Sequence, residues 1–238
     1  MVPAVLPARR RPIATASLAP VFGVSRSLFV VFEGIDGSGT TTQCDLLASW
    51  VETELGHPVV RTREPGGTPL GEAIRGLVLD PARGPVSDLA ELFLYAAGRA
   101  QHSALLIAPA LAAGKLVASD RYADSTMAYQ GYGRGLDRAM VATVNRAAVD
   151  NCTPDATVYL DLPVELARDR RQRRGGRPDR LEAAGDELQE RVRQGYLEIA
   201  RANPNAPILL DGSMNPDHLA QRIRAELRSW WPQFPLKQ

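Results

Sequence analysis

GIDGSGTT, at residues 34–41, has the spacing G-x-x-x-x-G-K-[ST] of a phosphate-binding loop at every position except one. The apolar run LFVVF at 28–32 precedes it and a helix-like segment follows, which is the strand–loop–helix context that the motif requires. The glycines let the backbone wrap around an anion with its N–H groups pointing inward. The hydroxyl of Thr41 is expected to bind magnesium. The exception is Thr40, which replaces the lysine that normally reaches the outer phosphates.

Composition limits the kinds of protein that this chain represents. It has 238 residues, 45% of them apolar, which is enough for one sizeable core. The net charge of +1 gives no reason to expect a nucleic-acid partner, and no apolar run approaches the roughly 20 residues that cross a bilayer. Cys44 and Cys152 form no spaced ligand cluster with the scattered histidines. Reduced thiols in the cytoplasm are therefore the simplest interpretation.

Residues 1–27 differ from the rest of the chain. They contain four arginines and no acidic residue, and the first acid is Glu33. Such a leader is either an organelle transit peptide or, more simply, a disordered bacterial extension or the result of an early start codon. Prolines interrupt any amphipathic helix here, which favours the extension. We expect a disordered segment at 1–27 and a single domain at 28–238.

Apolar runs and helical patterns alternate along that domain. Strands are predicted at 28–33, 58–62, 115–119, 157–161 and 207–210. Helices are predicted at 41–55, 87–113 (capped by Ser87 and stopped by Gly114), 137–149, 164–173, 186–202 and 216–230. This alternation predicts an α/β fold whose parallel sheet is covered by helices on both faces. Ligands bind beyond the carboxyl ends of such strands.

Several candidate site residues fall at those ends. Arg63 lies beside a Pro-Gly-Gly turn after the second strand, although an ordinary turn with a solvated charge would look the same. Asp120 ends the third strand, where magnesium is held in phosphate-loop proteins, and Arg121 follows it. Tyr95 and Arg99 share a helix face, as a base-stacking pair or as core residues with a snorkelling arginine.

The segment at 168–180, RDRRQRRGGRPDR, concentrates positive charge. Its glycine pair and proline end the preceding helix, which predicts an exposed and mobile segment. Beside a phosphate-binding loop, a cationic flap that closes over transferring phosphates fits this composition better than a nucleic-acid contact.

Together these motifs resemble the bacterial type of thymidylate kinase, a family of phosphate-loop nucleoside monophosphate kinases. The resemblance covers about 28–230 and rests on the following segments: FEGIDGSGTTTQ (32–43), TREPGGT (62–68), LFLYAAGRAQH (92–102), SDRYADSTMAYQGYGRG (119–135), PDATVYLDLP (154–163) and RRGGRPDRLE (173–182). The cation-free loop and the arginine-rich lid at about 168–180 match the bacterial type. The resemblance implies transfer of the γ-phosphoryl of ATP to dTMP, giving dTDP and ADP in dTTP synthesis. It also implies a magnesium requirement, a five-stranded parallel sheet and a homodimer.

The resemblance also assigns roles to single residues. ATP would be held by Gly34, Ile35, Asp36, Gly37, Ser38, Gly39, Thr40 and Thr41. Substrate would be held by Arg63, Tyr95 (stacked on thymine), Arg99, Arg121, Thr126, Tyr129 (near the 2′ position) and Gln130. Magnesium would be held by Thr41, Asp36 and Asp120, directly or through water. The catalytic residues would be Asp36, Arg121, Arg173, Arg174 and Arg177, with Arg180 as another lid cation.

Thr40 leaves the loop without its usual cation. One electrostatic donor of this kind is typically worth about 3–4 kcal/mol of barrier. Our hypothesis is that a lid arginine supplies the charge on closure. The alternatives are a nucleotide-binding protein with weak or no turnover and a kinase for another nucleoside monophosphate. A regulatory nucleic-acid binder is a more distant alternative.

Overall fold

The computed structural model describes residues 27–203 and 207–230, so the leader expected at 1–27 lies, except for Ser27, outside the described residues. In the described part, one sheet has the order β2-β3-β1-β4-β5, and all four neighbouring pairs are parallel. The strands are β1 (Leu28–Gly34), β2 (Val59–Arg63), β3 (Leu116–Asp120), β4 (Ala156–Asp161) and β5 (Pro207–Asp211). The predicted five-stranded parallel sheet is confirmed, and each strand lies within one residue of its predicted limits.

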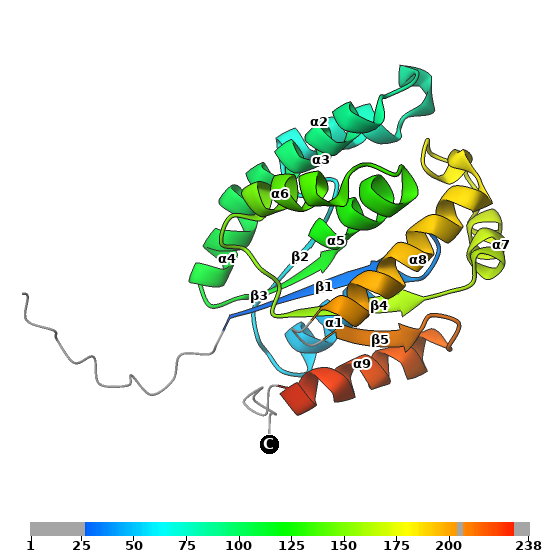
Figure 1. Cartoon of the computed structure of the whole chain (residues 1–238). Coiled ribbons are helices and arrows are strands. Elements are labelled where there is room, and N and C mark those ends of the chain that lie inside the picture. The colour runs from blue at the N-terminus through cyan, green and yellow to red at the C-terminus, as the bar shows by residue number, and fades with distance from the viewer. Residues whose placement is uncertain (1–26, 204–206, 231–238) are drawn as a thin grey trace, which may run out of the picture.

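Helices connect the strands and cover the sheet. They are α1 (Thr40–Thr53), α2 (Pro69–Leu79), α3 (Asp88–His102), α4 (Ala108–Ala112), α5 (Ala123–Thr126), α6 (Arg138–Val149), α7 (Val164–Arg174), α8 (Asp186–Ala202) and α9 (Pro216–Trp230). Short 3₁₀ turns lie at Pro81–Arg83 and Glu182–Ala184, and π-helical turns lie at Ser103–Ile107 and Met127–Gly133. Figure 1 shows α1 and α9 on one face of the sheet, most of the other helices on the opposite face, and α7 beyond the ends of the strands.

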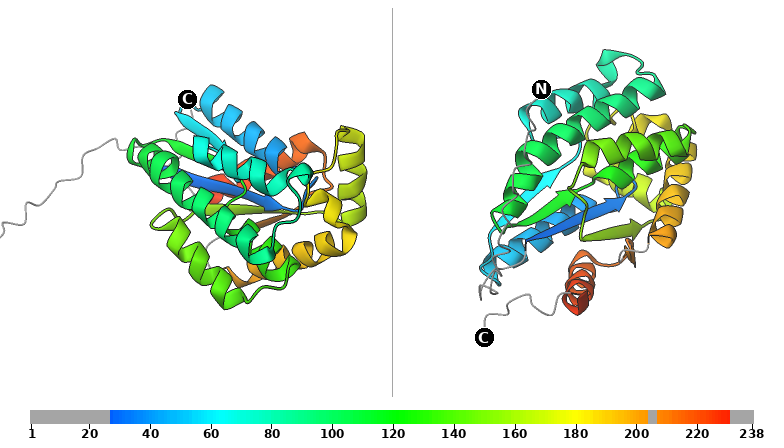
Figure 2. Two further views of the ribbon diagram at one scale, coloured as in Figure 1. Left: turned by 90° about the horizontal axis from the view of Figure 1, so that it is seen from above. Right: turned by 60° about the vertical axis from the view of Figure 1, so that its left-hand side comes forward.

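The alternation of side chains along β1 explains why both faces are covered. Leu28, Val30 and Phe32 pack into a core with α1 and α9. Phe29 and Val31 point the other way, into a second core. Because side chains alternate across a strand, a continuous apolar run must be buried on two sides. The two views in Figure 2 show the helical layers on either side of the sheet.

The structure corrects the long helix predicted at 87–113. It is divided into α3, a π-helical turn at Ser103–Ile107 and α4. Pro109 lies just beyond this turn and has no backbone N–H to donate, so regular α-helical hydrogen bonding cannot continue through it. Ser87 occupies the position before the helix, but its side chain makes no capping hydrogen bond. Gly114 follows the end of α4, as predicted.

Two helical regions were not predicted. The helix α2 follows the turn at 65–68, and α5 continues into the π-helical turn at Met127–Gly133. In α2 the signal was overlooked, since Leu70, Ile74, Leu77 and Val78 recur at helical spacing. At Met127–Gly133 the sequence has no such period, and packing against α8 favours the helical form.

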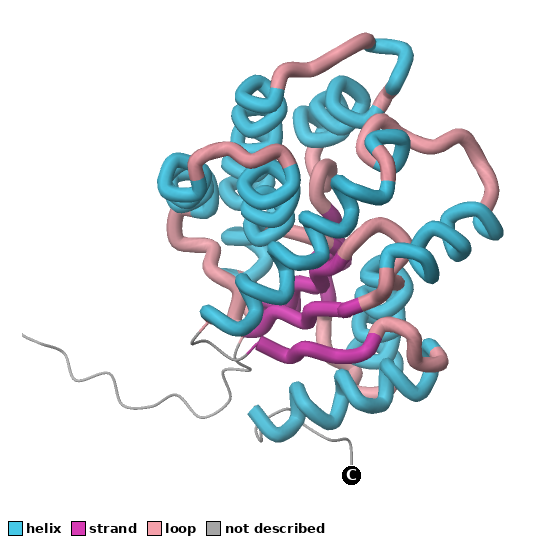
Figure 3. Tube along the Cα trace, turned by 45° about the vertical axis from the view of Figure 1, so that its right-hand side comes forward, coloured by secondary structure: helices cyan, strands magenta, loops and turns pink. Residues whose placement is uncertain are grey.

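Because all neighbouring strands are parallel, their carboxyl ends lie at one end of the sheet, with the loops after β1, β2 and β3. Figure 3 shows the strands surrounded by helices and joined to them by loops. The carboxyl end of a doubly wound sheet is where it binds its ligands. Among residues 27–203 and 207–230, no helix combines the length and apolar character needed to span a membrane.

Candidate active site

The phosphate-binding loop leaves β1 at Gly34 and ends where α1 begins. Gly37 and Gly39 have φ angles of 96° and 102°, in the left-handed region that glycine tolerates. A Cβ atom on Gly37 would lie only 2.7 Å from the carbonyl oxygen of Ala167, so a glycine is needed where α7 approaches the loop. With the amino end of α1 beside it, the loop forms a site for an anion.

Thr41, the last residue of the loop, and Asp120, at the end of β3, bring hard oxygen atoms together. Thr41 Oγ1 donates a 2.5 Å hydrogen bond to Asp120 Oδ2, and both residues line the cleft over the loop. Asp120 Oδ1 is buried and has no hydrogen-bond partner among the described residues. Carboxylate and hydroxyl oxygens are the ligands that magnesium prefers. Thr40 lines the same cleft and is 5% exposed.

Arg121 joins the end of β3 to the loop. Its guanidinium donates to Asp36 Oδ1 at 2.8 Å and to the Gly34 carbonyl oxygen at 2.7 Å. Its φ angle of 73° is unusual for a residue with a side chain, and strain of this kind is common at functional sites. Asp36 Oδ2 accepts hydrogen bonds from the Tyr129 hydroxyl at 2.8 Å and from Gln189 Nε2 at 3.2 Å. Asp36 and Arg121, two of the five residues that the resemblance implies to be catalytic, are thus in direct contact.

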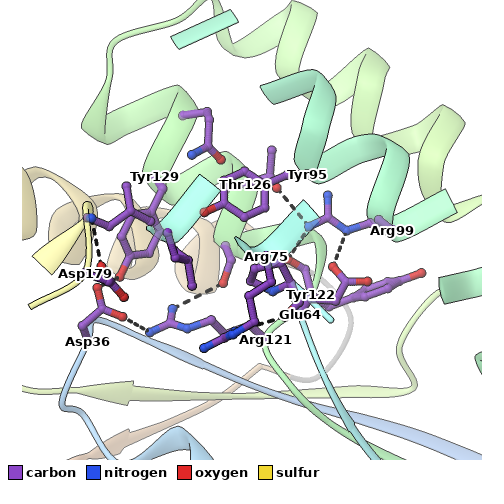
Figure 4. Close-up of a pocket in the computed structure, with 15 residues that line it drawn as sticks. Asp36, Glu64, Arg75, Tyr95, Arg99, Arg121, Tyr122, Thr126, Tyr129 and Asp179 are labelled. Carbon is purple, nitrogen blue, oxygen red and sulfur yellow. Dashed lines mark hydrogen bonds and ion pairs between the residues drawn. The ribbon is translucent and has the colours of Figure 1, made fainter. Parts of the chain in front are cut away.

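A second cavity opens on the far side of Arg121 (Figure 4). Six of the seven predicted substrate-binding residues line it: Tyr95, Arg99, Arg121, Thr126, Tyr129 and Gln130. These residues come from three separate parts of the chain, so the fold brings together what the sequence separates. Burial raises the pKa of Tyr95 and that of Tyr129 above the ordinary value, so both rings stay neutral.

Arg99 is a structural part of that wall. It is 2% exposed and donates to Glu64 Oε2 and Asn145 Oδ1, each at 2.8 Å. Its Nη2 donates at 2.9 Å to the Tyr122 carbonyl oxygen and to Thr126 Oγ1. Five residues from different elements are therefore fixed relative to one another.

Two further arginines approach the site from the β2–α2 region. Arg63, the seventh predicted substrate-binding residue, lines the cleft over the loop, where it forms an exposed ion pair with Glu72 at 3.1 Å. Arg75 was missed, and it lines both the cleft and the second cavity. A signal was present, since Thr68 followed by Pro69 is typical of a helix start.

The arginine-rich segment begins as the last turns of α7 and lies against the loop. Arg171 donates to the carbonyl oxygen of Asp36 at 2.6 Å, and Arg170 lies 3.4 Å from that of Ser38. Both line the cleft with Arg174 and Arg177. Arg173 is exposed and is not among the lining residues. The expectation of an exposed segment holds for 172–178, whereas residues 168–171 and 179–180 are half-buried.

Arg180 binds elsewhere. Its Nε donates to the Val78 carbonyl oxygen at 2.7 Å, and its Nη2 contacts the carboxylate of Glu91 on α3. Glu182, which follows it, accepts a 2.6 Å hydrogen bond from Arg174. The end of the lid is thereby tied to the wall of the second cavity.

A buried carboxyl group, that of Glu33 on β1, lies near Arg121. Glu33 is fully buried and accepts hydrogen bonds from the backbone N–H of Tyr122 at 2.8 Å and from the Tyr196 hydroxyl at 2.9 Å. Burial, and then the charge of Asp124, raise the pKa of Glu33 from 4.5 to about 7 despite these hydrogen bonds. Sequence reasoning missed Glu33, as it missed Gln189, because a single acid or amide in a strand or helix has no distinctive pattern.

Comparisons with known proteins agree on one family. The model of the thymidylate kinase family matches residues 32–223. The thymidylate kinase of Pelotomaculum thermopropionicum is 49% identical over 185 residues, which cover 78% of this chain and 85% of that protein. The thymidylate kinase of Trichlorobacter lovleyi is 43% identical, with 82% and 94% covered. The crystal structure of thymidylate kinase from Ehrlichia chaffeensis superimposes with a TM-score of 0.67 at 34% identity and covers 84% of this chain and 98% of that one.

Proposed function

The chain belongs to the thymidylate kinase family, and we propose that its site transfers the γ-phosphoryl group of ATP to dTMP, giving dTDP and ADP. One structural observation, besides the family membership, supports transfer between two bound nucleotides. The cleft over the loop and the second cavity share the lining residues Asp36, Glu64, Arg75, Arg121 and Asp179. A nucleotide held by the loop and one held in the cavity would therefore present their phosphates to each other across Asp36 and Arg121.

The two cavities suit the two substrates. The loop from Gly34 to Thr41 would hold the phosphates of ATP through backbone N–H groups. In the cavity, Tyr95 would stack on thymine, with Thr126 and Gln130 facing the base and Tyr129 near the sugar. Arg63, Arg75, Arg99 and Arg121 supply positive charge along the path of the dTMP phosphate and the base edge.

The chemistry needs positioning more than a base. The acceptor is an ionised phosphate, so no side chain has to remove a proton from a hydroxyl group. The contact between Asp36 and Arg121 fixes the arginine between the donor and acceptor sites. Alignment and charge stabilisation then lower the barrier, and closure of a lid excludes water that would hydrolyse ATP.

Magnesium fits the oxygen atoms at the end of the loop and of β3. Thr41 and Asp120 would hold it, since Asp120 Oδ1 is buried without a partner among the described residues. No group of three or more His, Cys, Asp or Glu side chains in the described ranges is arranged for a metal, so phosphate oxygens and water would complete the coordination. When bound, magnesium neutralises charge on the transferring phosphates. Asp36 would act on the acceptor side and reach the metal through water.

The charge absent at Thr40 would come from the lid. Besides Arg174 and Arg177, the neighbouring Arg170 and Arg171 line the cleft and approach carbonyl oxygens of the loop. A phosphate in the loop would offer these guanidinium groups a charged acceptor in place of neutral carbonyls. Arg173 remains a candidate that reaches the cleft only if the lid moves.

We infer further that residues 28–238 form one kinase domain with its lid at about 168–180, that the protein acts in the cytoplasm in dTTP synthesis, and that it forms a homodimer. The homodimer is supported by exposed apolar side chains on two adjacent helices: Leu70 and Leu77 on α2, and Leu89 and Phe93 on α3. Apart from Thr40 itself, nothing in the described residues favours the alternative of a nucleotide-binding protein with weak or no turnover.

A coupled assay of ADP release tests the proposed function. Wild-type protein is expected to release ADP only when ATP, magnesium and dTMP are all present. At saturating substrates, single Ala changes at Arg170, Arg171, Arg173, Arg174 and Arg177 identify the lid cation, because one of them is expected to reduce kcat by at least about 100-fold. Thr40→Lys in the same background is expected to restore part of the lost rate. A wild-type protein that makes no dTDP, with activity only in Thr40→Lys, would contradict the compensation.

A further inference from the structure

The inner wall of the second cavity carries two polar side chains four residues apart. Thr126 ends α5 and Gln130 lies in the π-helical turn at Met127–Gly133, and both line the cavity while being almost fully buried. Whether each side chain donates or accepts a hydrogen bond toward a ligand depends on the protein group that it already binds on its other side.

Behind Gln130 lies Glu91, which is 0% exposed. Glu91 Oε1 is 2.7 Å from Gln130 Nε2, and the carboxylate also binds the guanidinium groups of Arg134, at 3.3 Å, and Arg180. A carboxylate only accepts hydrogen bonds, so the NH₂ group of Gln130 must face it. The amide of Gln130 therefore has one orientation, with its carbonyl oxygen on the side away from Glu91.

Behind Thr126 lies Arg99, whose Nη2 donates to Thr126 Oγ1 at 2.9 Å. A guanidinium group only donates, so the hydroxyl oxygen accepts here and its proton is left for another acceptor. The wall thus combines a hydroxyl donor with an amide acceptor, and each is fixed by a charged partner.

We propose that Glu91 is a positioning residue that selects the base, by holding the Gln130 amide so that the cavity matches a pyrimidine with a 4-carbonyl group and an N3–H group. Thymine and uracil present this acceptor and donor side by side. Cytosine presents the reverse, an amino donor beside an N3 acceptor, and would place two acceptors or two donors against each other. This inference rests on the proposed function, because it concerns the monophosphate that the same cavity receives.

The test compares kcat/KM for dTMP, dUMP and dCMP in the full-length protein with Glu91→Gln. An amide at position 91 offers both a donor and an acceptor, so Gln130 is free to turn its NH₂ group toward the base. The ratio of dTMP to dCMP is expected to fall at least about tenfold, the effect of one lost or mispaired hydrogen bond. The ratio of dTMP to dUMP is expected to stay within about twofold, because these bases share the same edge.

Two further variants separate positioning from general damage. In Arg134→Gln the Glu91 carboxylate remains, so the dTMP to dCMP ratio is expected to stay within about twofold. In the exchange Glu91→Gln with Gln130→Glu, the new amide at 91 donates to the new carboxylate at 130, which again offers an acceptor to the base. This double variant is expected to recover most of the dTMP to dCMP ratio lost in Glu91→Gln.

An active Glu91→Gln protein with an unchanged ratio would overturn the inference and leave the proposed function intact. If Glu91→Gln fails to fold, the double variant decides, since a folded double variant without dTMP preference also overturns the inference. A wild-type protein without activity on dTMP or dUMP would instead overturn the proposed function.

Discussion

Two residues of this site have backbone conformations or surroundings that few other residues would tolerate. Arg121 has a positive φ angle, and Gly37 leaves no room for a Cβ atom beside the Ala167 carbonyl oxygen. Such positions cost folding energy and persist where surrounding contacts fix them. At such positions a substitution can change the free energy of unfolding and the catalytic activity by different amounts.

Gly37→Ala is expected to destabilise the protein more than Gly39→Ala. Both glycines have left-handed φ angles, so each substitution costs about 1–2 kcal/mol of conformational strain. A Cβ atom on Gly37 also meets the Ala167 carbonyl oxygen at 2.7 Å, whereas one on Gly39 meets no described atom within 4 Å. Urea unfolding of both variants measures the difference. Equal losses in the free energy of unfolding would show that the Ala167 carbonyl oxygen of α7 does not limit the space at Gly37.

Glu33 predicts a pH dependence of stability. Its pKa is about 7 in the folded protein and 4.5 as its ordinary value, so between these values the folded state binds more protons than the unfolded state. The contribution of this group to stability is therefore full below about pH 4.5, declines as pH rises to about 7, and is constant above it. Glu33→Gln removes that decline, so its stability relative to wild type is expected to improve across this range.

Thermal melts of the wild type and Glu33→Gln at pH 5, 6, 7 and 8 measure this difference. Glu52→Gln, which makes the same change at an exposed position on α1, is the control and should follow the wild-type curve. Parallel curves for all three proteins would mean that Glu33 is charged throughout in the folded state.

Whole elements show where pattern reading succeeds and where it fails. The strands are apolar runs and α1, α6, α8 and α9 have apolar periods, and all were predicted within about two residues. The helix α7 was predicted equally well although its sequence is mostly charged. The helix α2 was missed although Thr68 caps it by accepting a hydrogen bond from the backbone N–H of Gly71. The π-helical turn that carries Gln130 has no sequence period of its own, because its form depends on packing against α8.

An ion pair between the end of β2 and α3 is expected to be one of the main contacts that hold these elements together. Glu64 and Arg99 are 2.8 Å apart, with side chains 6% and 2% exposed. Glu64→Gln leaves the guanidinium buried without its counter-charge, and the free energy of unfolding is expected to fall by about 3–5 kcal/mol. Glu72→Gln, which breaks the exposed pair with Arg63, is expected to cost less than about 1 kcal/mol. Urea unfolding compares the two variants, and similar costs would contradict a structural role for the buried pair.

At the scale of the whole molecule, the candidate site lies at the carboxyl ends of the strands, and four of the seven exposed large apolar side chains among the described residues lie on α2 and α3. The loops after β1, β2 and β3 lie together at the carboxyl ends of these parallel strands. The adjacent helices α2 and α3 carry Leu70, Leu77, Leu89 and Phe93 as exposed apolar residues. Apolar groups of this kind, when contiguous, mark protein interfaces.

Phe93→Glu is expected to convert the proposed dimer to a monomer. Phe93 is 53% exposed on α3, and a charge at this position would be buried in an apolar interface. Leu209→Glu, at a residue 43% exposed on the edge strand β5, is the control and should leave the mass unchanged. Light scattering after size-exclusion chromatography measures both. An unchanged dimer mass in Phe93→Glu would place the interface elsewhere.

The order of residues along the chain was enough to predict the phosphate-binding loop and the five parallel strands, because glycine spacing and apolar runs are local properties. The candidate substrate residues were implied by the family resemblance of its motifs, and their roles remain predictions. Folding was needed to show that Arg75 borders both cavities, that Arg170 and Arg171 approach the loop, and that Arg180 and Gln130 share the carboxylate of Glu91. These contacts join residues far apart in the chain, such as Arg171 and Asp36. Such pairings follow from how the helices pack around the sheet, and no local pattern contains them.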